Sequence, residues 1–97
     1  MDIKFVKDLT NPGPDGRNLL FEINEKKIEI SICGTKISEM GFKDIDNLNI
    51  DVLLEKLEEE AIIDLIEGKL KQFQEENISL EKVDISSTQI LFKTKKL

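Results

Sequence analysis

Residues 19–33 read LLFEINEKKIEISIC, and their alternation of apolar and polar side chains decides the class of fold. Successive side chains of a strand point to opposite faces, so every second residue shares a face. Two alternating runs flank a short turn near Glu25-Lys26, and their apolar residues are Leu19, Phe21, Ile23, Ile28, Ile30 and Ile32. The stretch predicts an antiparallel hairpin with one buried face.

The segments around this hairpin predict further strands and two helices. Residues 3–6 are a short strand candidate, residues 35–41 predict a turn of helix, and residues 50–75 predict a long helix. Residues 80–94 alternate again and predict a C-terminal hairpin. The sequence therefore predicts a single α+β domain over residues 1–97. It would be a small antiparallel sheet of four to five strands with one long helix packed on it.

Turn and capping residues lie between these elements. The segment 10–17, TNPGPDGR, predicts a loop, because its Pro-Gly and Asp-Gly pairs suit tight turns. Thr35 or Ser38 can cap the short helix, and Asn47 or Asn49 can cap the long one, since these side chains accept hydrogen bonds from free backbone N–H groups.

The predicted long helix carries two apolar stripes instead of one. At about 100° per residue, one set of side chains lies within about 60° of Ile50, and a second set lies near the opposite side. The first set is Leu53, Leu54, Leu57, Ala61 and Leu65, and the second is Ile62, Ile63, Ile66, Leu70 and Phe73. The change of face around Ala61–Leu65 predicts one of two things. Either the helix bends, with Gly68 as a further weak point, or one stripe is an interface.

Composition limits the partners that the protein can have. A formal net charge of −6 argues against non-specific nucleic-acid binding, which needs a basic surface, and suits either solubility or a basic protein partner. The first residues, MDIKFVKDL, lack the apolar core of a signal peptide, and no run approaches a membrane span. The lone Cys33 fits a reducing compartment. We therefore expect a cytoplasmic protein that contacts neither nucleic acid nor a membrane directly.

Residues that carry chemistry are scarce. The sequence has no histidine, so Cys33 lacks the usual activating base and zinc lacks a ligand cluster. Glu60, Asp64 and Glu67 share one ridge of the predicted helix, which is typical of a solvated face. The segment 44–51, DIDNLNID, departs from the calcium-loop pattern, and helix capping explains it more simply. We expect no enzyme, no cofactor and no metal site.

One resemblance rests on the order of elements. The run LLFEINEKKIEISICGTKISEMG, followed by LLEKLEEEAIIDLIEGKLKQ and LEKVDIS, resembles a family of small bacterial proteins built on a domain of unknown function. It covers roughly residues 3–86, and the tail TQILFKTKKL extends beyond the family's pattern. The resemblance implies an α+β fold with a helix packed on a small antiparallel sheet, and it brings no catalytic residues.

Two functions remain open at this stage. The first is a non-enzymatic interaction or regulatory module that acts through the long helix on another protein or on a second copy of the chain. The second is a small acidic inhibitor, of the phage or mobile-element type, that occupies a basic nucleic-acid-binding surface of a larger protein. The candidate interface residues are Leu53, Leu54, Glu55, Leu57, Glu58, Glu59, Glu60, Ile62, Ile66, Leu70 and Phe73.

Overall fold

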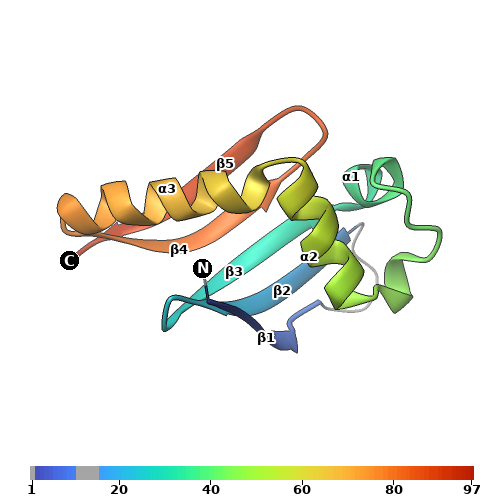
Figure 1. Ribbon diagram of the computed structural model, residues 1–97, viewed down its shortest axis with the longest axis horizontal. Coiled ribbons are helices and arrows are strands. Elements are labelled where there is room, and N and C mark those ends of the chain that lie inside the picture. The colour runs from blue at the N-terminus through green and yellow to red at the C-terminus, as the bar shows by residue number, and fades with distance from the viewer. Residues whose placement is uncertain (1, 11–15) are drawn as a thin grey trace.

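A computed structural model describes residues 2–10 and 16–97, and Figure 1 shows two layers, a sheet with helices on one face. In spatial order the strands are β1 (Ile3–Asp8), β2 (Gly16–Ile23), β3 (Lys26–Cys33), β4 (Ile78–Ile85) and β5 (Ile90–Lys96). The helical elements between β3 and β4 are α1 (Gly34–Glu39), the 3-10 helix η1 (Ile45–Asn47), α2 (Ile50–Glu59) and α3 (Ile62–Glu75). The predicted α+β class is confirmed.

The sheet is mixed, where an antiparallel one was predicted. Strands β1, β2 and β3 form an antiparallel meander, and β5 is antiparallel to β4. Strand β4 instead runs parallel to β3, with Ile30 opposite Val83. The reason is the crossover: the helical segment carries the chain back along the sheet, so β4 starts at the same end as β3.

The predicted hairpin is the centre of the sheet. Its turn consists of Asn24 and Glu25, which both have positive φ, 49° and 70°, as a two-residue type I′ turn requires. All of its predicted inward-facing residues are buried: Leu19, Phe21, Ile23, Ile28, Ile30 and Ile32. The hairpin therefore forms the floor on which the helices pack.

The predicted long helix is divided into α2 and α3 at Ala61, which confirms the bend. Ala61 has φ 60°, in the left-handed region, and its N–H donates to the Glu58 carbonyl at 3.0 Å. The next bond, from Leu65 N–H to the Ala61 carbonyl at 3.1 Å, starts α3. Gly68 lies inside α3 and does not interrupt it.

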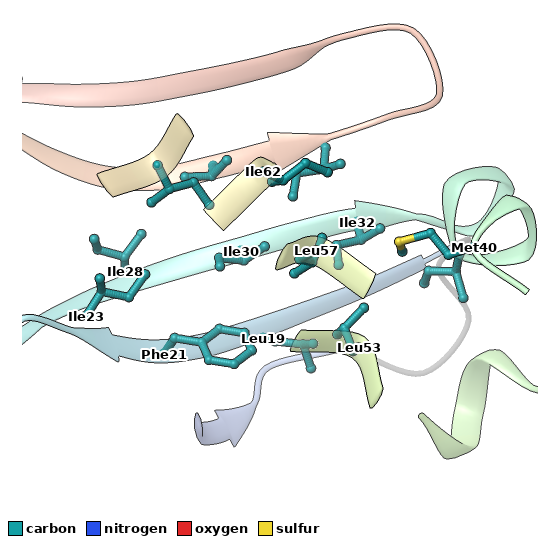
Figure 2. Packing of buried hydrophobic residues seen from close by; sticks show 14 of the residues in the cluster. Leu19, Phe21, Ile23, Ile28, Ile30, Ile32, Met40, Leu53, Leu57 and Ile62 are labelled. Atoms are coloured by element: carbon teal, nitrogen blue, oxygen red, sulfur yellow. The ribbon is translucent and has the colours of Figure 1, made fainter. Parts of the chain in front are cut away.

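Both apolar stripes enter one core. Leu53 and Leu57 of α2 and Ile62 and Ile66 of α3 are all buried against the sheet. Figure 2 shows Leu53 and Leu57 over the apolar side chains of β2 and β3, and Ile62 nearer to β4. The break at Ala61 reorients the second half of the stretch, so that each stripe meets a different part of the same sheet. Leu65, at the change of face, is 40% exposed.

The helix caps agree with the sequence in one case and differ in the other. Asn49 caps α2, because its Oδ1 accepts a hydrogen bond from Val52 N–H at 3.2 Å. The predicted helix α1 is present, but its predicted cap is wrong: the helix begins at Gly34 after Cys33, which places Thr35 and Ser38 inside it. The turns predicted within residues 11–15 lie outside the described residues. In the described part of the chain, no helix is long and apolar enough to span a membrane.

Candidate functional site

The apolar residues of the predicted interface lie in the protein's own core. Leu53, Leu57, Ile62 and Ile66 are buried, and the half-buried members, Leu54, Leu70 and Phe73, pack against the same cluster. The Phe73 ring also meets Phe92 of β5 edge-on, with 6.3 Å between ring centroids. On α2 and α3 the exposed large apolar side chains are Val52 and Leu65. The two stripes therefore serve folding in this structure.

The acidic residues of the predicted interface are exposed on the helices. Glu55, Glu58, Glu59 and Glu60 all lie on the outer surface of α2 and its C-terminal end. Glu60 is held by Lys36 of α1, whose Nζ lies 2.6 Å from a carboxylate oxygen. Glu59 lies 3.9 Å from Lys56, one turn back on the same helix.

A hollow lies where α2, α3 and β1 meet. Its volume is about 300 Å³, and it is lined by Ile3, Leu54, Ile63, Glu58, Asp64 and Glu67. We call this hollow and its three carboxylates the acidic corner. The predicted acidic ridge is thereby rearranged: Asp64 and Glu67 stay together, Glu58 joins them, and Glu60 turns to Lys36.

The carboxylates of the acidic corner lack cationic neighbours. Among the ion pairs between described residues, none involves Glu58, Asp64 or Glu67. Glu58 also lies in the last turn of α2, where the partial negative charge of the helix end disfavours a carboxylate. Asp64 lies in the first turn of α3, where the opposite helix end favours it. The corner therefore combines unneutralised charge with an apolar floor.

Asp44 of the predicted calcium-like segment acts as a helix cap, because its side chain accepts hydrogen bonds at the start of η1. The Asp44 carboxylate accepts hydrogen bonds from Asn47 Nδ2 at 2.9 Å and from Asp46 N–H at 3.0 Å. These bonds, the one from Asn47 first, hold the pKa of Asp44 below its usual value. Within residues 2–10 and 16–97, no group of three or more candidate metal ligands comes together.

The sheet face opposite the helices carries a polar network that sequence reasoning missed. Lys82 Nζ lies 3.1 Å from a Glu29 oxygen and 3.7 Å from Asp84, and Lys93 lies 3.4 Å from Asp84. The hydrogen bond to Glu29 is the main cause of a raised pKa for Lys82. Strand alternation predicts that these residues share a face, but only the parallel β3–β4 pairing brings Glu29 to Lys82.

A second hollow, of about 310 Å³, opens beside this network at the ends of β3 and β4. Cys33, Ser31 and Asp84 are among the residues that line it. Because the sequence has no histidine and Asp84 is already paired with two lysines, this arrangement presents no nucleophile held by a base.

Comparison with known proteins gives no family or relative for this chain. No protein-family model matches it, and no curated protein or solved structure shows significant similarity. The resemblance in the order of elements therefore stays a prediction.

Proposed function

We propose that this protein is a non-enzymatic interaction module that binds a basic surface of another protein through the acidic corner. The proposal keeps the two helices as the working surface. It assigns binding to their exposed carboxylates, because their apolar stripes are packed in the core. Self-association through those stripes loses its support for the same reason.

The placement of Glu58 carries the proposal. Three consecutive glutamates end α2, where the helix end and their mutual repulsion both oppose negative charge. Lys56 pairs with Glu59, and Lys36 pairs with Glu60. Glu58 instead lines the hollow together with Asp64 and Glu67. Charges that oppose local stability are typical of surfaces selected for binding.

The chemistry of the corner suits an arginine or lysine side chain. The aliphatic stem of such a residue would contact Ile3, Leu54 and Ile63, while its charged end reaches the carboxylates. Arginine has the advantage, because its planar guanidinium donates two parallel hydrogen bonds to one carboxylate. The proposed setting is the cytoplasm, for which the lone Cys33 is the support.

A narrower form of the proposal is an inhibitor that covers a basic nucleic-acid-binding surface. Asp51 and Glu55 extend the row of carboxylates along the outside of α2, beyond the corner itself. A row of this kind can replace the phosphates of a nucleic acid on a basic surface. This form predicts that the partner, once bound, no longer binds DNA or RNA.

The test uses an arginine-rich peptide as the probe. The corner variant carries Glu58→Gln, Asp64→Asn and Glu67→Gln. The matched control carries Glu25→Gln, Glu75→Gln and Glu81→Gln, which removes the same charge at exposed positions elsewhere. We expect the corner variant to bind about tenfold more weakly, with a shallower salt dependence, and the control to change less than about threefold. Equal losses in the two variants would reduce the effect to net charge and reject the corner.

A further inference from the structure

We propose that β5 is a docking strand, to which an extended acidic segment of a partner adds as a sixth strand of the sheet. The proposal is independent of the acidic corner, since it concerns the far edge of the sheet (Figure 1). Strand addition of this kind uses the free backbone groups of an edge strand for affinity and its side chains for specificity.

The hydrogen bonds at the ends of the β4–β5 hairpin show which backbone groups of β5 face away from the sheet. Ser86 N–H donates to the Gln89 carbonyl at 3.0 Å, and Leu97 N–H donates to the Asn77 carbonyl at 3.2 Å. Residues of an antiparallel pair bond to the neighbouring strand in alternation. Both bonds show that the odd-numbered residues on the β5 side of the hairpin direct their backbone N–H and C=O groups toward β4. The outward backbone groups therefore belong to Ile90, Phe92, Thr94 and Lys96.

The edge that these groups form is continuous. Strand β5 pairs with β4 over its whole length, and the register shift lies in β4, between Leu80 and Lys82. The other edge strand differs, because β1 has an irregularity between Phe5 and Lys7 that interrupts its pairing. Bulges and bends protect a sheet edge against strand addition, and β5 lacks this protection.

The side chains of β5 select the charge of the partner. Lys93 and Lys95 lie with Leu91 on the open face of the sheet, and the strand carries no acidic residue. Lys95 and Lys96 take part in none of the ion pairs between described residues. Acidic side chains on every second residue of an added strand would lie beside Lys93 and Lys95.

The same lysines disfavour a second copy of the chain as the added strand. Two β5 strands side by side would place Lys93, Lys95 and Lys96 of one copy next to those of the other. Like charges on neighbouring strands are destabilising, and lysine is a common protection of sheet edges against self-pairing. The same positive charges therefore disfavour pairing with a second copy of β5 and favour pairing with an acidic segment.

The probe is a short, end-capped peptide in which glutamate and valine alternate. Its glutamates would face Lys93 and Lys95, while its valines lie on the side of Phe92. We expect saturable binding that weakens with salt, and slower hydrogen exchange at the Phe92 and Thr94 amides. A lysine–valine peptide, and a peptide with its glutamates and valines in two blocks, should bind at least tenfold more weakly. Equal binding of all three peptides, or unchanged exchange at those amides, would overturn the proposal.

Thr94→Pro tests the backbone directly. Proline removes the N–H of residue 94, which points away from the sheet, so the hairpin should persist while peptide binding falls at least tenfold. Thr94→Ala is the matched control and should bind as the unchanged protein does. Full binding by a folded Thr94→Pro variant would contradict the proposal.

A charge reversal keeps the test decisive if proline unfolds the strand. The variant with Lys93→Glu and Lys95→Glu, which reverses the two charges on the open face, should prefer the lysine–valine peptide over the glutamate–valine one. Sedimentation of the unchanged protein at high concentration completes the set. A monomer supports an acidic partner, whereas a dimer with protected Phe92 and Thr94 amides would show that a second copy occupies the edge.

Discussion

The helices α2 and α3 come from one stretch that reads as a single amphipathic helix, and both end in glutamates, yet they begin by different means. Helix α2 begins at a side-chain cap, Asn49. Helix α3 begins at Ala61, which makes no side-chain cap bond, and places Asp64 in its first turn. The difference shows that hydrophobic periodicity reports where each half is buried, whereas backbone geometry at one residue decides how the halves meet.

Truncating one buried residue in each helix tests whether the two stripes share one core. Leu57→Ala in α2 and Ile66→Ala in α3 should each lower the free energy of unfolding by about 2–5 kcal/mol, because both side chains are fully buried. Leu65→Ala is the matched control at 40% exposure and should change it by about 0.5 kcal/mol or less. Urea denaturation measures all three, and a large loss at Leu65 would show that the stripe does not change face.

Much of this architecture follows from the sequence, and the failures have physical causes. The central hairpin and the Asn49 cap follow from local patterns. The parallel pairing of β4 with β3 does not, because it joins segments far apart in the chain. At Ala61 the sequence has a good helix former, so only the shift of the stripe indicated a break. The break also places Glu58, instead of the predicted Glu60, beside Asp64 and Glu67, and the sequence pattern does not reveal this change either.

Replacing Ala61 tests whether its left-handed backbone conformation separates the two helices. A non-glycine residue in the left-handed region costs about 1 kcal/mol, so Ala61→Gly should raise the free energy of unfolding by up to about that amount. Ala61→Val should lower it, since a β-branched side chain fits this conformation poorly. Thermal unfolding followed by circular dichroism measures both. Stabilisation by valine would mean that the two helices are continuous in solution.

Removing the cap of α2 tests the other helix start. Asn49→Ala should cost about 1 kcal/mol, because Val52 N–H loses its acceptor at the first turn. Asn47→Ala is the comparison, since that side chain donates to Asp44 and caps no α-helix. It should cost less in the same denaturation experiment. A larger loss of stability for Asn47→Ala would mean that Asn49 is not the residue that caps α2.

The smallest expected effect concerns the end of α2. Glu58→Gln should raise the free energy of unfolding by about 0.3–0.5 kcal/mol at low salt, because it removes a carboxylate from an unfavourable helix end. The gain should fade in high salt, which screens the interaction. Glu55→Gln, one turn earlier, should gain less. A loss of stability at position 58 would mean that the carboxylate has a favourable partner in the folded protein.

The parallel pairing of β3 with β4 has a consequence for the order of folding. The β1–β2–β3 meander and the β4–β5 hairpin each form by local contacts, which close quickly. Joining them requires closure of the loop from Cys33 to Ile78. This closure costs conformational entropy before the β3–β4 contacts form and offset that cost. We therefore expect the C-terminal hairpin to dock last. Until it does, the central strand β3 presents an open edge, and this intermediate stage is when a newly made chain is most exposed to mispairing.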